Sequence, residues 1–286
     1  MRRERVSDDI YVFTSDLYAQ VTAAAIVTRE GIVVIDTLPF PIETAEMIDY
    51  LNSLGHGPIK YLVNTHWHGD HTNGNYLFDD KVELVCHKRC QQAMQEFGPE
   101  ALAESQETTP LLEEVELRIP EVVFENGELV LHVGNKSIEL ALTPGHTPDS
   151  IVAYVREDKV LIAADTVMPV PYFVWGSRHD FRESLKLLQS YNLESIVQGH
   201  GEVLLRGEIP RAIESSIEYL DMLEKRVQEV IDKGKNKQTL DKLTIERCGK
   251  SRIPLNGLVQ DLHRANAYFL YDELVGSQEE TNQVAA

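Results

Sequence analysis

The sequence is poor in cysteine, in basic side chains and in long apolar runs. Three cysteines are an odd number and too few for a disulfide framework, which favours a reducing compartment and a cytoplasmic location. No apolar run approaches the roughly 20 residues that cross a bilayer. The basic start MRRERVSDDIYVF lacks the apolar stretch of a signal peptide. We therefore expect neither a secretion signal nor a membrane partner.

Acidic residues outnumber basic ones, with 46 Asp and Glu against 27 Lys and Arg, for a net charge of −19. Nucleic-acid binding usually requires a basic face that displaces counterions, and no basic patch stands out in the sequence. We therefore expect a small-molecule partner and no nucleic acid. With 43% hydrophobic residues, the 286-residue chain has the composition of an ordinary globular protein.

Short β-branched runs and amphipathic stretches follow one another along the first 205 residues. Strands are expected at 10–15, 21–28, 31–36, 59–65 and 81–87, and again within 122–143, 150–158, 159–166 and 194–200. Helices are expected at 42–55, 88–97, 99–118 and 180–191. The order is strands, helix, strand and helices, then strands, helix and strand again. It predicts an α/β sandwich built from two similar halves.

The pattern changes near residue 210. Apolar residues fall on one helical stripe within 209–234, a polar linker covers 233–238, and a second amphipathic helix is expected over 254–276. The last ten residues, SQEETNQVAA, suggest a frayed tail. We therefore divide the chain into a catalytic domain, 1–209, and a C-terminal helical extension, 210–286. This extension either folds over the cleft or forms a homodimer surface, and both alternatives stay open.

The stretch NTHWHGDHTNGN gathers three of the ten histidines within six positions. Its motif reads H-x-H-x-D-H and consists of His66, His68, Asp70 and His71. Imidazole nitrogens and carboxylates are ligands of first-row metal ions. Because the motif follows an expected strand and lies among Gly, Asn and Thr, we expect a loop that wraps these side chains around a metal.

Further candidate ligands each lie just past an apolar strand-like run. They are His146 in TPGHTPDS, Asp165 in AADT and His200 in QGHG. Side chains just beyond strand ends in α/β folds converge in one crevice, so we expect these three to join the motif. Asp36 ends the run GIVVID in the same way, and we expect it to support the ligands.

Seven candidate ligands exceed the three or four that one catalytic zinc takes. They suit two divalent ions that share one bridging ligand, with a water or hydroxide between them. Zinc is the first expectation, and iron or manganese would accept the same ligands.

The order of these motifs resembles that of the metallo-β-lactamase-fold hydrolase superfamily. The resemblance covers residues 6–205 and rests on HWHGDH, the GH at 145–146, the AD at 164–165 and the GH at 199–200. It implies a four-layer αβ/βα sandwich with the metals in a cleft at one edge of the two sheets. It also implies a ligand assignment. His66, His68 and His146 would bind the first metal, and Asp70, His71 and His200 the second. Asp165 would bridge the two metals, and Asp36 would orient the ligands.

The same resemblance implies that a metal-bridging hydroxide cleaves a small-molecule ester, thioester, lactone or lactam, with Asp70 also relaying a proton. The ligand set is more similar to that of glyoxalase II and lactonases than to that of classical zinc β-lactamases, which carry Cys or Ser where Asp165 stands. β-Lactamase activity proper and a persulfide dioxygenase-like oxidoreductase with one iron remain as alternatives. A non-enzymatic metal-binding protein is disfavoured because no ligand is missing.

Aromatic residues near the expected metal site are candidates for substrate contact. The segment MPVPYFVWG follows Asp165 and is too rich in proline for a helix. We expect its Tyr172, Phe173 and Trp175 to form an apolar rim together with Trp67. His179, in the following loop, is a further candidate.

Overall fold

A computed structural model describes residues 1–284, and the side chains up to residue 277. The strands form two mixed sheets. The seven-stranded sheet has the order β1 (Arg2–Ser7), β2 (Ile10–Thr14), β3 (Thr22–Thr28), β4 (Gly31–Ile35), β5 (Ile59–Asn64), β6 (Glu83–His87), β7 (Val122–Phe124). The six-stranded sheet has the order β13 (Leu204–Leu205), β12 (Ser195–Gln198), β11 (Val160–Ala164), β10 (Ile151–Val155), β9 (Lys136–Leu142), β8 (Glu128–Val133).

Helices connect and cover the sheets. The α-helices are α1 (Pro41–Ser53), α2 (Gly69–Thr72), α3 (Lys88–Glu96), α4 (Gly98–Thr108), α5 (Arg178–Leu188), α6 (Ile209–Asp232) and α7 (Val259–Val284). Short 3₁₀ turns are η1 (Asn75–Leu77), η2 (Pro110–Leu112), η3 (Lys237–Lys242), η4 (Ile245–Cys248) and η5 (Leu255–Gly257). In the described part of the chain, none of these helices combines the length and apolarity that a membrane crossing requires.

The two sheets are built in the same way, as the order of elements predicted. In each, antiparallel strands lead to a helix that returns the chain to a parallel neighbour: β4–α1–β5 in the first sheet and β11–α5–β12 in the second. Parallel neighbours end at the same edge. The residues that follow β4, β5, β11 and β12 therefore lie at the carboxyl edges of their sheets.

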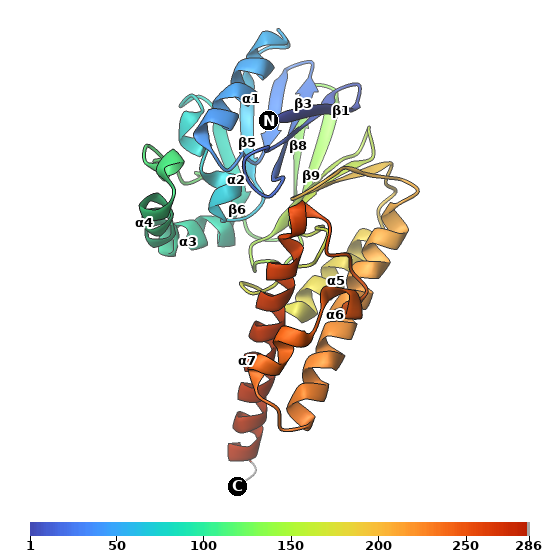
Figure 1. Cartoon of the computed structure of the whole chain (residues 1–286). Helices are drawn as coiled ribbons and strands as arrows, with labels where there is room; N and C mark the ends of the chain where they lie inside the picture. The colour runs from blue at the N-terminus through green and yellow to red at the C-terminus, as the bar shows by residue number, and fades with distance from the viewer. Residues whose placement is uncertain (285–286) are drawn as a thin grey trace.

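Apolar side chains separate the molecule into four layers, which confirms the expected αβ/βα sandwich. One cluster, including Ile26 and Leu140, fills the space between the sheets. A second lies between the first sheet and α1, and a third between the second sheet and helices α5, α6 and α7. Figure 1 shows α1, α3 and α4 on one side of the sheets and α5 and α6 on the other.

Local sequence explains the bounds of α1 and the end of α4. Helix α1 has proline at its first position, and Gly55 follows its end with a positive φ of 69°. The expected helix over 99–118 is too long: α4 ends at Thr108, and Pro110 begins η2. Proline disfavours helical backbone in the residue before it, which accounts for the early end.

Helices α6 and α7 lie side by side and extend away from the sandwich (Figure 1). Tyr219 of α6 is fully buried, and its hydroxyl donates to Nδ1 of His263 on α7 at 3.0 Å. The expected frayed tail is wrong for residues 277–284, which continue α7, while residues 285–286 lie outside the described residues. The first turns of α7 are stabilised by packing against the apolar cluster outside the second sheet.

Lys250 places an ammonium group against α6, where no carboxylate among the described side chains forms an ion pair with it. Its Nζ donates to Oγ of Ser215 and of Ser216, both at 3.0 Å. Burial and the nearby Arg211 lower the pKa of Lys250 to about 8, against the smaller opposing effect of Glu218. The charged form is therefore unfavourable in the folded state.

We expect Lys250→Met to raise the free energy of unfolding by about 1–2 kcal/mol at pH 7, because the buried charge is removed. Between pH 8 and 10.5 the folded wild type binds fewer protons than its unfolded chain, so its stability rises with pH in that window. The difference in the free energy of unfolding between Lys250→Met and the wild type should therefore become smaller as the pH rises. Urea unfolding of both proteins across this pH range measures this difference. A difference that stays constant would contradict the lowered pKa of Lys250.

Candidate metal centre

The H-x-H-x-D-H motif lies where β5 leaves the first sheet. His66 follows the strand, His68 precedes α2 in extended conformation, and α2 carries Asp70 and His71. The chain bends over residues 65–67, and the rings of His66 and His68 lie 4.8 Å apart, with the Trp67 ring also 4.8 Å from that of His68. The single turn of α2 then brings the next two side chains to the same place.

The structure brings the predicted ligands together in two groups. Within each group, the candidate ligand atoms all lie within 4.8 Å of one another. The first group is His66, His68, His146 and Asp165, and the second is Asp70, His71 and His200. These are the seven residues that the sequence singled out.

Asp165 lies in contact with both groups. Its Oδ2 is 3.1 Å from Nε2 of His146 and 3.4 Å from Nε2 of His200. Its Oδ1 is 3.3 Å from Nε2 of His71. The carboxylate therefore reaches histidines of both groups, which fits a ligand that two cations would share.

Hydrogen bonds on the far side of the imidazole rings fix the orientation of several histidines. Nδ1 of His146 donates to the carbonyl oxygen of Tyr172 at 2.7 Å, and Nδ1 of His200 donates to that of Ala19 at 3.0 Å. A proton on Nδ1 leaves the Nε2 lone pair directed at the centre, which is the arrangement of a metal-ligating histidine.

Asp36 organises the first-sheet side of the centre. Its Oδ2 lies 3.2 Å from Nδ1 of His71 and accepts from Oγ1 of Thr65 at 2.6 Å, while its Oδ1 accepts from Thr65 N at 2.8 Å. Asp36 has a positive φ of 60°, which a short polar side chain tolerates better than most. These contacts place it behind the ligands, in the supporting position that the sequence suggested.

The donor atoms at the centre fit divalent metal ions. Nε2 of His66, Nε2 of His71 and Oδ1 of Asp165 are buried without a hydrogen-bond partner, although buried polar atoms are normally satisfied. Nδ1 of His68 and Nε2 of His146 face each other at 2.9 Å. A cation between these atoms would satisfy them together.

Protonation states differ across the centre. Burial would lower the pKa of His71 and of His200, but the carboxylates of Asp165 and Asp70 outweigh it and raise both, so a metal ion would displace a proton from these two rings. Burial lowers the pKa of His66 well below its usual value and that of His68 to about 3, so both imidazoles are neutral. Burial alone would raise the pKa of Asp165, but His200, His146 and His71 hold it well below its usual range. Neutral imidazole and ionised carboxylate are the forms that bind metals.

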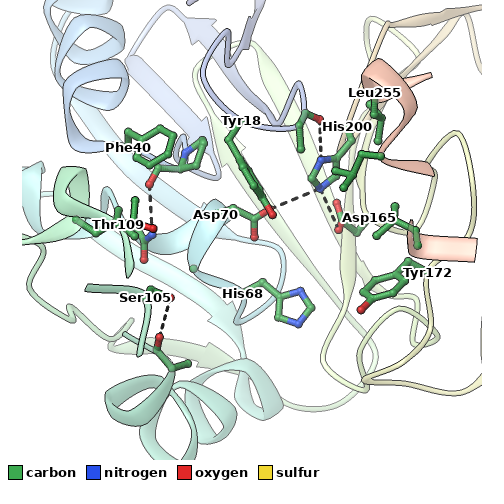
Figure 2. Close-up of a pocket in the computed structure, with 18 of the residues that line it drawn as sticks. Tyr18, Phe40, His68, Asp70, Ser105, Thr109, Asp165, Tyr172, His200 and Leu255 are labelled. Atoms are coloured by element: carbon green, nitrogen blue, oxygen red, sulfur yellow. Dashed lines mark hydrogen bonds and ion pairs between the residues drawn. The ribbon is translucent and has the colours of Figure 1, made fainter. Parts of the chain in front are cut away.

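A cavity of about 390 Å³ opens above the two groups and is lined by Trp67, His68, Asp70, Asp165 and Tyr172 among others. Figure 2 shows Tyr172 beside Asp165, facing this cavity. Trp175 is 58% exposed and does not line the cavity, but its ring packs edge-on against Trp67 at 5.9 Å. The structure thus puts Trp67 and Tyr172 in the cavity wall and Trp175 next to it.

Two of the expected substrate contacts are placed elsewhere. Phe173 is fully buried and packs with Phe269 in the cluster outside the second sheet. Its neighbour Tyr172 takes the outward position, because Asn266 of α7 accepts from Phe173 N at 3.1 Å and fixes the backbone there. His179 lies in the first turn of α5 with 78% of its side chain exposed, and does not line the cavity. Both assignments as substrate contacts are corrected.

Several cavity residues had no recognisable signal in the sequence. They are Tyr18 and Ala19 between β2 and β3, Phe40 before α1, Met168 after β11, and Leu255, Leu258 and Leu262 at the start of the C-terminal helix α7 and before it. They come from four separate segments, and only the tertiary structure brings these segments to the centre. The C-terminal extension therefore contributes to the cavity wall, and a homodimer surface on it stays a prediction.

Comparison with protein-family models gives one match of this chain, over residues 18–243, to the family described as "Metallo-beta-lactamase superfamily". The match covers strands β3 to β13 and all seven candidate ligands, and ends directly after η3.

Curated relatives share about a quarter of the aligned residues. "Beta-lactamase-like protein 2 homolog" of Caenorhabditis elegans is 25% identical over 60% of this chain and 51% of its own length. A "probable metallo-hydrolase" of Methanocaldococcus jannaschii is 26% identical over 55% and 77%, and the "thioesterase pkgB" of Emericella nidulans is 24% identical over 60% and 43%. The chain thus spans about half the length of several of these relatives.

Solved structures agree on the fold. A metallo-beta-lactamase from Pontibacter korlensis superposes with a TM-score of 0.59 at 20% identity, covering 74% of this chain and 97% of that one. A sec-alkylsulfatase from Pseudomonas sp. superposes with a TM-score of 0.73 at 18% identity, covering 95% of this chain and 50% of that one. Coverage of 95% takes in the C-terminal helices as well as the sandwich.

We expect the purified protein to hold about two divalent ions per chain. Asp165→Ala should reduce this to below one, because both groups lose their common carboxylate, whereas His200→Ala should retain about one. Elemental analysis after dialysis against metal-free buffer measures the content. His179→Ala is the matched control, since it removes an exposed histidine away from the centre. Full metal content in Asp165→Ala would contradict the bridging position.

We also expect Asp36→Asn to weaken metal affinity about 10- to 100-fold, because His71 loses the carboxylate that orients it. Asparagine preserves the side-chain volume and tolerates the positive φ. Competition with a chelating dye measures the affinity. Asp180→Asn, which alters an exposed aspartate, serves as the control. Equal affinities in the two variants would show that Asp36 does not support the ligands.

Proposed function

We propose that this chain, which belongs to the metallo-beta-lactamase superfamily, is a binuclear metal-dependent hydrolase that cleaves a small-molecule ester, thioester, lactone or lactam. The observation that carries the proposal is the position of Asp165, in contact with both histidine groups at the floor of a cavity large enough for a small substrate. A "thioesterase" and a "probable metallo-hydrolase" among the relatives support a hydrolytic reaction.

Divalent ions bound at this centre would activate water at neutral pH and polarise a carbonyl oxygen. The ligand set offers imidazole and carboxylate, so zinc is the metal that we propose first, with iron or manganese as alternatives. A complete seven-residue set with aspartate at position 165 favours the glyoxalase II and lactonase branch over classical β-lactamases.

Asp70 is the residue that we assign to proton transfer. Its Oδ2 lies 3.6 Å from Nε2 of His200 and 4.0 Å from Nε2 of His71, and its side chain is partly open to the cavity. A carboxylate in this position accepts a proton from the attacking water and returns it to the leaving group. Asp165 is enclosed by histidines and holds the centre together instead.

Tyr18 and Tyr172 supply hydroxyl groups to the cavity. Burial raises the pKa of both, and the carboxylates of Asp70 and Asp165 raise that of Tyr18 further. Both phenols therefore keep their protons at neutral pH and are hydrogen-bond donors. We assign them to the oxygen of the substrate carbonyl, where negative charge develops during attack.

The remaining expectations about partners stand as part of this proposal. The substrate is a small molecule, and neither nucleic acid nor a membrane is expected to bind. The exposed faces of α6 and α7 would form a homodimer, while their inner faces pack on the sandwich. A cytoplasmic location agrees with three free cysteines.

We expect metal-loaded protein to hydrolyse at least one class in a panel of aryl esters, thioesters, lactones and β-lactams. Asp70→Asn should lower kcat by about 10²- to 10⁴-fold, because the proton relay is lost. Activity should disappear on chelation and return on adding the metal, while His179→Ala should retain wild-type rates. Kinetics are measured on protein of known metal content.

Two results would contradict this function. One is a fully metal-loaded protein that hydrolyses no member of the panel. The other is one iron per chain together with oxygen consumption on a persulfide substrate, which would favour the dioxygenase alternative.

A further inference from the structure

The cavity above the metal centre is built from uncharged side chains once the candidate ligands are set aside. Among its described lining residues there is no lysine or arginine. The histidines that line it, His68, His146 and His200, direct ring nitrogens at the centre. A carboxylate or phosphate on the distal part of a substrate would therefore meet no cation in this wall, and its desolvation would go uncompensated.

One side of the cavity is apolar. It is formed by Met168, Tyr172, Leu255, Leu258 and Leu262. Leu258 and Leu262 are partly buried and pack against the core cluster outside the second sheet, which holds them in place. The C-terminal segment that begins at η5 therefore supplies a preformed apolar surface next to the reacting centre.

The opposite side is neutral and of mixed polarity. Its polar residues are Asn73, Ser105, Thr108 and Thr109, and its apolar residues include Phe40, Ala101 and Leu112. Figure 2 shows Asp70 on the side of the centre that faces Thr109 and Ser105, with Tyr172 and Leu255 on the other side, beyond Asp165. The cavity thus has two ends of different chemistry.

Proton delivery decides which part of a substrate lies at which end. The leaving group takes the proton from Asp70 and so points toward the side of Ser105 and Thr109. The acyl group then points the other way, toward Tyr172 and Leu255. This orientation rests on the hydrolytic function proposed above.

We propose that the substrate is an uncharged ester or thioester with an apolar acyl chain of medium length, and that Leu258 and Leu262 of the C-terminal segment select it. The acyl chain lies along the wall made by these leucines, Met168 and Tyr172. A cavity of 390 Å³ is near the lower end of the roughly 300–1,000 Å³ typical of ligand sites, which suits chains around octanoyl rather than much longer ones.

Hydrolysis balances without a further reactant. Water adds to the acyl carbon, the bond from that carbon to the oxygen or sulfur of the leaving group breaks, and the leaving group departs with a proton. The products are a fatty acid and an alcohol or thiol.

The test measures kcat/KM for p-nitrophenyl acetate, butanoate, hexanoate and octanoate on metal-loaded protein. Each added methylene should raise kcat/KM by up to about fourfold, the equivalent of about 0.8 kcal/mol. The half-ester of suberic acid, which has the octanoyl length and a terminal carboxylate, should be hydrolysed at least about tenfold more slowly than the octanoate.

Leu262→Ala and Leu258→Ala should each lower the ratio of octanoate to acetate kcat/KM by about tenfold. Leu274→Ala is the matched control, because Leu274 is a partly buried leucine of α7 that packs on the same core cluster without lining the cavity. It should leave the ratio unchanged. Since the ratio is internal to each protein, partial unfolding of a variant does not alter it.

A binding measurement separates this inference from the proposed function. Octan-2-one is uncharged and cannot be hydrolysed, and it should bind the wild type about tenfold more tightly than Leu262→Ala. If octan-2-one binds in this way but no ester or thioester is cleaved, the proposed hydrolase function is contradicted and the acyl-binding wall is supported. If esters are cleaved with no dependence on chain length, or the suberic half-ester is preferred, the acyl-binding wall is contradicted and the proposed hydrolase function is supported.

Discussion

The buried carboxylate of Asp165 is the constraint on which the rest of this structure depends. An ionised group away from water must be compensated by charges or hydrogen bonds, or it loses its charge. Here the compensation comes from His71, His146 and His200, which lie on three separate segments of the chain. Those segments meet only where the carboxyl edges of the two sheets come together, so the centre and the sandwich require each other.

Backbone geometry around the centre shows how closely the segments approach. A Cβ atom at Gly199 would lie 1.9 Å from Oδ1 of Asp165, so only glycine permits the chain after β12 to pass the carboxylate. Ala164 and Asp36 both have positive φ, at 43° and 60°. Strained residues of this kind persist where the surrounding structure holds them, and they concentrate at functional sites. The two sheets therefore meet at backbone conformations that ordinary loops avoid.

The candidate ligands could be predicted from the sequence because they lie in the short segments that follow strands, as His66 does after β5 and Asp165 after β11. The fold followed from the same alternation of apolar runs. Residues in irregular segments could not be placed. Tyr172 and Phe173 are adjacent aromatic residues, and tertiary contacts, the hydrogen bond from Phe173 N to Asn266 and the packing of Phe173 on Phe269, distinguish the one that faces the cavity. Tyr18 gave no signal because its neighbours in the cavity are remote in the sequence.

The C-terminal helix links the substrate wall to the metal ligands. Asn266 of α7 accepts from Phe173 N and donates to the carbonyl oxygen of Pro171, while the intervening Tyr172 accepts at its own carbonyl from Nδ1 of His146. One turn earlier, Leu262 lines the cavity. The same helix therefore forms part of the apolar cavity wall and, through residues 171–173, helps to orient the candidate ligand His146. An acyl chain bound along this wall, as proposed, would also press on the backbone that orients His146.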